Sequence, residues 1–229
     1  MKNMVIAVDG FSSCGKSTLA KAIAKELNLV YIDTGAMYRG ATLLAMEAGF
    51  IHDDCVDSEK LANVLVKSVM TFKINGGINQ LFLDDRNIER EIRTIEISDK
   101  VSYVSKIPEV RNILVDWQRA MGSSMNVILD GRDIGTVVFP NADVKFFVTA
   151  SVDIRAKRRF EELKMMGEHV TYNEVVSNIQ KRDYIDQNRE MSPLRQAEDA
   201  IVLDNSFLNR EQQLEQAIKY VRSKRPDFF

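Results

Sequence analysis

Cysteine, histidine and long apolar runs are scarce in this chain. Its two cysteines, Cys14 and Cys55, are too few for a disulfide framework, which points to a reducing compartment. Two histidines and the absence of a CxxC pair argue against a zinc site built by the protein. No apolar stretch of about 18 residues occurs, and the first residues lack the apolar core of a signal peptide. We therefore expect a cytoplasmic protein.

Neither sign of charge dominates the composition. The 31 lysines and arginines nearly cancel the 33 aspartates and glutamates, and the formal net charge is -2. Proteins that bind nucleic acids or anionic membranes usually carry a basic excess, so we expect neither partner here. We also expect a monomer. The 229 residues, 45% of them hydrophobic, suffice for the core of one α/β domain with an insertion.

A phosphate-binding loop is the most informative motif that is present. The segment Gly10-Phe11-Ser12-Ser13-Cys14-Gly15-Lys16-Ser17 fits GxxxxGK[ST], follows the apolar run 4–8 and precedes apolar residues at helical spacing. Glycines at both ends let the backbone N–H groups turn inward, and the following helix adds its positive N-terminal end. The predicted nucleotide contacts are Gly10, Phe11, Ser12, Ser13, Cys14, Gly15, Lys16, Ser17 and Thr18.

Three side chains of this loop have distinct expected roles. Lys16 is expected to reach the β- and γ-phosphates, and the Ser17 hydroxyl to bind Mg²⁺. Cys14 is expected to pack as a small apolar side chain. The alternative for Cys14 is a redox-sensitive thiol, which a peroxide response lost in Cys14→Ala would reveal.

Short β-prone runs alternate with helix-like segments along most of the chain. The runs are 5–8, 30–32, 127–129, 144–148 and 201–203. This alternation predicts an α/β fold whose parallel central sheet is flanked by helices on both faces. Helix starts are indicated by Pro108 and by capping boxes at Thr171 with Glu174 and at Asn209 with Gln212.

One region departs from this alternation. The runs 69–74 and 78–83 flank Asn75-Gly76-Gly77, which predicts a β-hairpin, and the chain before Ile92 is expected to add a third short strand. The sequence therefore predicts a small antiparallel insert between helices.

Acidic and basic side chains gather where ligands of α/β proteins usually bind. Asp130-Gly131-Arg132-Asp133 follows a buried strand, at the edge of the sheet where such ligands lie. Asp130 is expected to orient Mg²⁺ through water, with Arg132 and Asp133 facing a substrate crevice. Further arginines open one predicted helix and share a face of the next, in two sets: Arg155, Arg158 and Arg159, then Arg182 and Arg189 with Asp186.

These arginines favour one class of phosphate-loop protein. Small kinases need several arginines to spread the charge of the transition state. GTPases read guanine with an NKxD segment, which this sequence lacks. A small-molecule kinase is therefore the leading hypothesis, and a nucleotide-dependent switch is the alternative from another class.

The combined motifs resemble the bacterial type of cytidylate kinase over nearly the whole chain. The matching segments are the phosphate loop from Val8 to Thr18, Asp33-Thr34-Gly35-Ala36-Met37-Tyr38-Arg39, Glu91-Ile92-Arg93-Thr94, Pro108-Glu109-Val110-Arg111, and Asp130 through Pro140. The resemblance implies a three-layer P-loop NTPase fold with a small antiparallel β insert and a helical lid. It also implies ATP-dependent phosphorylation of CMP and dCMP, with Mg²⁺ as cofactor. A uridylate or shikimate type of kinase is the alternative.

The resemblance also implies site residues. The expected CMP contacts are Thr34, Tyr38, Arg39, Ser102, Arg111, Arg132, Asp133, Arg182, Asp186 and Arg189. The residues expected to act in catalysis are Lys16, Arg132, Arg158, Arg182 and Arg189, with Ser17 and Asp130 at the metal. We expect a single kinase domain over 1–229, with a core of 1–60 and 105–229, an acceptor-binding and insert region near 61–104, and a lid near 155–190.

Overall fold

The computed structural model describes residues 3–53, 55–75 and 78–229. The chain divides into two compact units, one made of Met1–Ile32 and Met121–Phe229 and the other of Asp33–Ala120.

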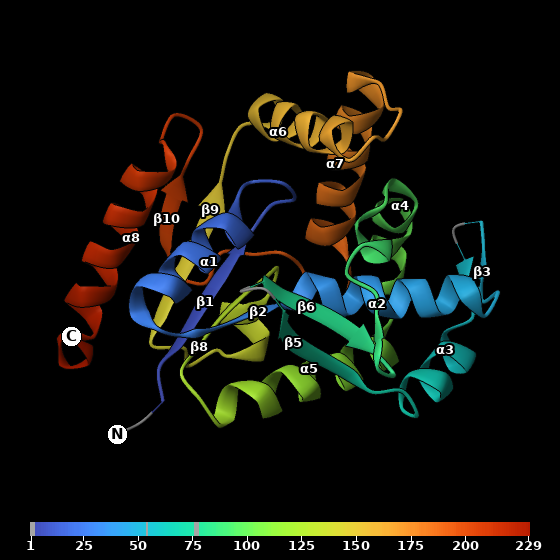
Figure 1. Ribbon diagram of the computed structural model, residues 1–229, viewed down its shortest axis with the longest axis horizontal. Helices are drawn as coiled ribbons and strands as arrows, with labels where there is room; N and C mark the ends of the chain where they lie inside the picture. Colours follow the sequence, from blue (N-terminus) through green and yellow to red (C-terminus); the bar gives the residue numbers. More distant parts are fainter. Residues whose placement is uncertain (1–2, 54, 76–77) are drawn as a thin grey trace. The chain divides into compact units, whose positions relative to one another are not determined.

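The first unit is built on a five-stranded sheet with the order β10-β9-β1-β8-β2 (Figure 1). Strand β1 pairs in parallel with β8 and β9, and β9 pairs in parallel with β10. The strands are β1 (Val5–Gly10), β2 (Val30–Asp33), β8 (Val127–Gly131), β9 (Val144–Thr149) and β10 (Ile201–Asp204). Each contains one predicted run, so the predicted parallel sheet is confirmed. Its central strands are almost wholly buried, as in sheets covered on both faces.

Two helices of the first unit lie side by side in Figure 1, namely α1 (Lys16–Leu27) and α8 (Arg210–Lys224). The apolar positions of α1 repeat at helical spacing and are all buried, as predicted: Leu19, Ala20, Ile23, Ala24 and Leu27. They belong to one core cluster with Phe146 of the sheet and Val221 of α8. The α/β fold class, a parallel sheet flanked by helices, is confirmed.

The other helices of this unit include a packed pair, α6 (Val152–Met165) and α7 (Tyr172–Asn188). The capping boxes predicted at Thr171 and at Asn209 are both present, at the starts of α7 and α8. A π-helical turn, η2 (Ile134–Val138), follows β8, and a short 3-10 helix, η3 (Pro226–Phe228), follows α8.

The prediction that Arg182, Asp186 and Arg189 share a helical face is wrong for Arg189. Helix α7 ends at Asn188, and Arg189 has an extended backbone with φ -63° and ψ 141°. Arg189 is the C-cap residue: its N–H donates to the Ile185 carbonyl over 2.9 Å, and its Nε donates to the Ser192 carbonyl, beyond the helix, over 2.7 Å. Only Arg182 and Asp186 are therefore placed by helical spacing.

The second unit joins helices to small antiparallel sheets. Its helices are α2 (Thr34–Glu47), α3 (Ser58–Leu65), η1 (Glu91–Arg93), α4 (Ile95–Val104) and most of α5 (Pro108–Ser123), which starts at the predicted Pro108. Strands β3 (Ile51–His52) and β4 (Cys55–Val56) form one antiparallel pair. Strands β5 (Met70–Asn75), β6 (Ile78–Leu83) and β7 (Arg86–Asn87) form the other sheet.

The three-stranded sheet confirms the predicted antiparallel insert. Leu81 and Leu83 of β6 are buried in a cluster with Ala36 and Leu43 of α2 and with Ile92 of η1. The predicted turn residues Gly76 and Gly77 lie outside the described residues. Within the parts of the chain that are described, no helix has the length and apolar character needed to cross a membrane.

Candidate active site

The loop between β1 and α1 depends on glycine at both ends. Gly10 has φ 146° and Gly15 has φ 90°, backbone conformations that L side chains rarely adopt. A Cβ on Gly10 would lie 2.0 Å from the carbonyl oxygen of Val148 in β9. Gly15 is the N-cap of α1 and supplies no side-chain cap, so the first N–H groups of the helix have no side-chain acceptor from their own cap. This is the geometry in which helix N-termini bind phosphate.

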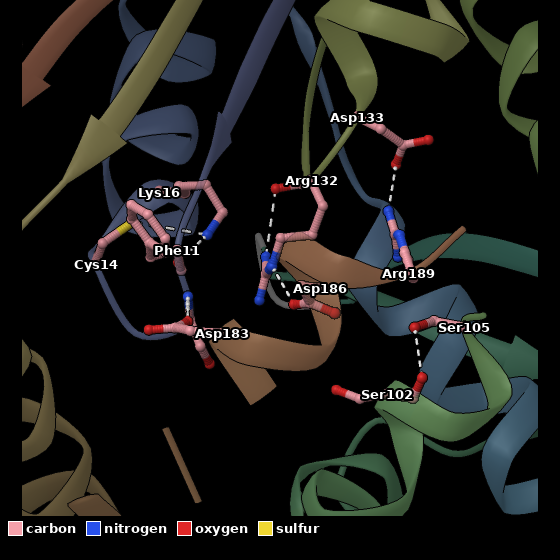
Figure 2. Close-up of polar contacts among 12 residues, drawn as sticks. Phe11, Cys14, Lys16, Ser102, Ser105, Arg132, Asp133, Asp183, Asp186 and Arg189 are labelled. Atoms are coloured by element: carbon pink, nitrogen blue, oxygen red, sulfur yellow. Dashed lines mark hydrogen bonds and ion pairs between the residues drawn. The ribbon is translucent and has the colours of Figure 1, made fainter. Parts of the chain in front are cut away.

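Lys16 lies back against this loop. Its Nζ donates to the Phe11 carbonyl oxygen and lies 3.6 Å from Cys14 Sγ (Figure 2). Lys16 is 5% exposed, and burial, reinforced by the positive charge of Arg132, lowers the pKa of its ammonium group. Cys14 is fully buried, as its expected packing role requires. A buried cation of this kind favours a negatively charged ligand, because the ligand would offset the cost of desolvation.

The side chains expected at a metal are in contact with each other. Ser17 Oγ donates to Asp130 Oδ2 over 2.7 Å, and the Tyr31 hydroxyl donates to Asp130 Oδ1 over 2.8 Å. Asp130 is 4% exposed. A hydroxyl beside a buried carboxylate offers the oxygen donors that Mg²⁺ prefers. The donor set therefore fits Mg²⁺, which usually takes few protein ligands and completes its coordination with water and substrate phosphate.

No larger metal-binding cluster accompanies this pair in the described ranges 3–53, 55–75 and 78–229. No three or more His, Cys, Asp or Glu side chains there come together in a way that could hold a metal ion.

Two predicted acceptor-side arginines are paired with predicted carboxylates (Figure 2). Arg132 Nε donates to Asp186 Oδ2 over 2.8 Å, and Arg189 Nη2 lies 3.4 Å from Asp133 Oδ1. These pairs join the segment after β8 to the end of α7. Sequence spacing placed the four residues in two separate motifs, and the first unit brings the motifs together.

Arg182 differs from these two arginines. It is 8% exposed, and its Nε has no hydrogen-bond partner among the described residues. Burial, followed by the positive charge of Arg132, lowers the pKa of Arg182 to about 10, so the group remains charged at neutral pH. A buried guanidinium beside another cation is costly unless an anion binds there.

Arg155 of α6 supports the phosphate loop at Ser12. Its Nη1 donates to Asp183 Oδ2 and, over 3.2 Å, to the Ser12 carbonyl oxygen. Asp183 Oδ1 in turn accepts from the Ser12 N–H over 3.2 Å. Both backbone polar groups of Ser12 are therefore held by side chains of α6 and α7. Arg155 thus supports the phosphate loop, whereas Arg158 of the same helix lines a pocket over this loop.

A pocket of about 690 Å³ lies over the phosphate loop. Residues 13–18 of the loop line it, whereas Gly10, Phe11 and Ser12 of the predicted ATP set do not. Arg158, Met165, Asn205, Leu208 and Gln213 are among its other lining residues. Gln213 is 5% exposed, and within the described part of the chain its Nε2 has no hydrogen-bond partner. The pocket combines cations, amides and apolar side chains, as nucleotide sites commonly do.

The predicted site residues of the second unit are bonded to other residues of that unit. Arg39 Nη1 donates to Ser98 Oγ over 2.9 Å and to the Ile92 carbonyl over 3.2 Å. Arg111 is 1% exposed, donates to the Ser105 carbonyl over 3.1 Å and has its guanidinium 5.4 Å from the centre of the Tyr38 ring. 

The other two predicted residues of this unit are also fixed by helices. Thr34 is buried at the start of α2, where Asp33 caps the helix by accepting from Ala36 N–H. Ser102 is buried in α4, and its carbonyl accepts from Ser105 Oγ over 3.2 Å (Figure 2). Burial favours a raised pKa for Asp33, but its ion pair with Arg93 holds that pKa below the ordinary value. The start of α2 is thus tied to η1.

Sequence reasoning assigned no role to Asp9, Tyr31 or Asn205. Asp9 accepts hydrogen bonds of 2.7 Å from the N–H groups of Ile134 and Gly135, directly after Arg132 and Asp133. Asn205 contacts both the phosphate loop and Arg158. A usable signal exists for Asp9 and Asn205, since both stand at the carboxyl ends of parallel strands. Tyr31 lies within β2 and not at its carboxyl end, so the sequence pattern gives no such signal for it.

Comparison with known proteins assigns the chain to a family. The family model for cytidylate kinase matches residues 6–223. The chain belongs to the cytidylate kinase family. A cytidylate kinase of Flavobacterium johnsoniae is 51% identical over 223 residues, covering 96% of this chain and 97% of the relative. A cytidylate kinase of Bacteroides thetaiotaomicron is 50% identical over 217 residues, covering 94% of this chain and 95% of the relative.

A solved structure supports the fold alone. An uncharacterized protein from Eubacterium ventriosum superposes with a TM-score of 0.53 at 12% sequence identity, covering 97% of this chain and 99% of the other. The cytidylate kinase family assignment therefore rests on sequence, and the parallel sheet with its phosphate loop agrees with it.

Proposed function

We propose that the protein transfers the γ-phosphoryl group of ATP to CMP and dCMP, giving CDP or dCDP and ADP. The observation that carries the proposal is the buried guanidinium of Arg182 beside Arg132, with an Nε that has no hydrogen-bond partner among the described residues, in a chain of the cytidylate kinase family. In the described part of the chain Asp186 pairs with Arg132 alone, so the second cation, Arg182, favours a further anion, and the phosphate of a nucleoside monophosphate would supply it.

The phosphate loop would hold the donor. The N–H groups at the start of α1 and the ammonium group of Lys16 would bind its β- and γ-phosphates. Lys16 would exchange the Phe11 carbonyl for a phosphate oxygen, which is a charge-assisted and therefore stronger partner. Ser17 and, through water, Asp130 would hold Mg²⁺, which neutralises phosphate charge when bound.

The acceptor residues suit the parts of CMP. Arg39, Arg132 and Arg182 are planar, permanently charged donors for its phosphate. Asp186 suits ribose hydroxyls, and the mixed donors and acceptors needed by a cytosine edge are offered by Ser102, Arg111 and Asp133.

Transfer needs no covalent intermediate on the protein. An oxygen of the acceptor phosphate would attack the γ-phosphorus in line with the leaving ADP oxygen, so that one P–O bond forms as the other breaks. Lys16, Arg158, Arg182 and Arg189 would spread the charge of the transferring group. Closure of a lid formed by residues near 155–190 would exclude water and limit hydrolysis of ATP.

The division of the chain into regions stays a prediction from the family resemblance. We infer one kinase domain over 1–229, with an acceptor-binding and insert region near 61–104 and the core in 1–60 and 105–229. The monomeric state, the cytoplasmic location and the absence of a nucleic acid or membrane partner stay predictions from composition.

A coupled assay of ADP formation tests the proposal directly. CMP, dCMP, UMP, AMP and shikimate are offered at matched concentrations with ATP and Mg²⁺, and we expect the highest kcat/KM with CMP or dCMP. Preference for UMP, AMP or shikimate would overturn the acceptor assignment. Tight binding of GTP with no turnover of any acceptor would instead favour a nucleotide-dependent switch.

A further inference from the structure

The residue that follows β10 reaches back to the phosphate loop. Asn205 is 3% exposed, and its N–H donates to the Thr149 carbonyl over 3.0 Å, extending the pairing of β10 with β9. Its side-chain Nδ2 donates to the Cys14 carbonyl over 2.6 Å, across 191 positions of sequence. Asn205 therefore fixes the loop backbone immediately before Gly15, where the chain enters α1.

The same residue holds Arg158 at two points. Arg158 Nη1 donates to Asn205 Oδ1 and Arg158 Nη2 donates to the Asn205 carbonyl, each over 2.9 Å. Two parallel hydrogen bonds fix the direction of the planar guanidinium as well as its distance. Both residues line the pocket of about 690 Å³ over the phosphate loop. Asn205 thus sets where the positive charge of Arg158 lies in that pocket.

The acceptors on Asn205 are neutral, and this distinguishes Arg158 from nearby arginines. Arg132, Arg155 and Arg189 each face a carboxylate, which offsets their charge. None of the ion pairs among residues 3–53, 55–75 and 78–229 includes Arg158. A guanidinium held by neutral oxygens is oriented without losing its charge to a protein anion, so the full charge remains for a ligand.

We propose that Asn205 is a positioning residue, which locks Arg158 against the phosphate loop so that its charge faces the phosphates of the bound donor nucleotide. The inference rests on the proposed function. An amide suits this position because one short side chain must accept from Arg158 and donate to the Cys14 carbonyl. An aspartate would pair with Arg158, cancel its charge and oppose the Cys14 carbonyl with a second acceptor.

A double-mutant cycle tests the proposal by ATP binding alone. Asn205→Ala, Arg158→Ala and the double variant are compared with wild type by titration calorimetry with ATP and Mg²⁺ in the absence of acceptor. We expect each single variant to weaken ATP binding about tenfold, the size of one charge-assisted contact. Because Asn205 acts through Arg158, the double variant should bind ATP within about twofold of Arg158→Ala. Asn63→Ala, the same change at an exposed position, should bind as wild type.

Three outcomes would overturn the proposal. If Asn205→Ala weakens ATP binding equally with and without Arg158, Asn205 does not act through that arginine. If all three variants bind ATP as wild type does, the positive charge of Arg158 does not contribute to the affinity for ATP. Asn205→Asp preserves the side-chain shape. It replaces Asn205→Ala in the double-mutant cycle if thermal unfolding shows that the alanine variant is not folded. Wild-type affinity in Asn205→Asp would refute the requirement for a neutral anchor.

Kinetics separate this inference from the proposed function. With CMP as acceptor, Asn205→Ala should raise KM for ATP and lower kcat, and KM for CMP should stay within about twofold of wild type. An unchanged KM for ATP with a raised KM for CMP would contradict the placement at the donor. If the wild-type protein does not phosphorylate CMP, the proposed function fails, and the ATP-binding cycle still decides the role of Asn205.

Discussion

Arg132 Nε and Asp186 Oδ2 lie 2.8 Å apart and join the segment after β8 to α7. Arg132 is the more exposed partner, with 19% of its side chain accessible against 6% for Asp186. Removal of the arginine would therefore leave a carboxylate that is buried and unpaired, whereas removal of the charge on Asp186 would leave an arginine that can reach water.

The Arg132–Asp186 pair predicts unequal effects of its two single variants. Arg132→Ala should lower the free energy of unfolding by roughly 2–5 kcal/mol, because a buried charge loses its partner. Asp186→Asn should cost less. The double variant should regain part of the stability but none of the CMP affinity, as measured by denaturant unfolding and by KM for CMP. Unchanged CMP affinity and turnover in Arg132→Ala would refute the acceptor site.

Lys16→Ala should depress turnover with little effect on CMP binding. Loss of a preorganised charge at the transferring group typically costs about 10²- to 10³-fold in kcat. Steady-state kinetics and CMP titration measure the two effects separately. Lys25→Ala, an exposed change in the same helix, is the matched control and should retain wild-type turnover. A loss of CMP affinity as large as the loss of kcat would place Lys16 at the acceptor instead.

Tyr31→Phe should weaken the response to Mg²⁺. The variant removes the hydrogen bond from Tyr31 to Asp130 Oδ1 and leaves the Ser17 contact in place. Loss of such a supporting contact typically costs about tenfold in metal affinity, so half-maximal activity should require about tenfold more Mg²⁺. Tyr220→Phe, whose ring packs on Phe146, should leave that concentration unchanged. An unaltered Mg²⁺ titration in Tyr31→Phe would show that Asp130 needs no orienting partner.

Asp9 predicts a pH dependence of stability. Burial raises the pKa of its carboxyl group from 3.8 to about 7, against the opposing effect of two backbone N–H donors. Between these values the folded state holds a proton that the unfolded chain has released. The contribution of Asp9 is therefore fully present below about pH 4 and is lost as pH rises through about 7.

Thermal unfolding between pH 4 and 8 measures this contribution. We expect Asp9→Asn, which cannot ionise, to lose less stability over that range than the wild-type protein does. Asp116→Asn, an exposed change in α5, should keep the wild-type slope. A slope in Asp9→Asn equal to that of wild type would assign the pH dependence to other groups.

Sequence patterns predicted the strands and helix starts because interactions between residues close together in the sequence determine where these elements form. The apolar runs around Val127 and Val144 lie in β8 and β9, and the capping boxes at Thr171 and Asn209 start helices. In each case the residues that carry the signal are within a few positions of each other. Arg189 shows the limit, because the helix ends at Asn188 and the Arg189 side chain donates to the Ser192 carbonyl beyond it.

Contacts across the sheet could not be predicted in the same way. Tyr31 contacts Asp130 because the strand order places β2 beside β8. Asn205 contacts Cys14 because β9 and β10 lie on the other side of β1. A sequence pattern reports which segments are strands but contains no order among them. The phosphate loop was predictable as a local motif, and the long-range contacts that support it were not.

The close approach of Gly10 to Val148 bears on protein engineering. Since the space beside Gly10 is filled by the backbone of β9 and not by a side chain, no substitution in β9 can make room for a larger residue at position 10. The phosphate loop and β9 therefore have to be considered together when the loop is redesigned. A phosphate loop grafted into another sheet would need glycine at its first position wherever the neighbouring strand approached as closely.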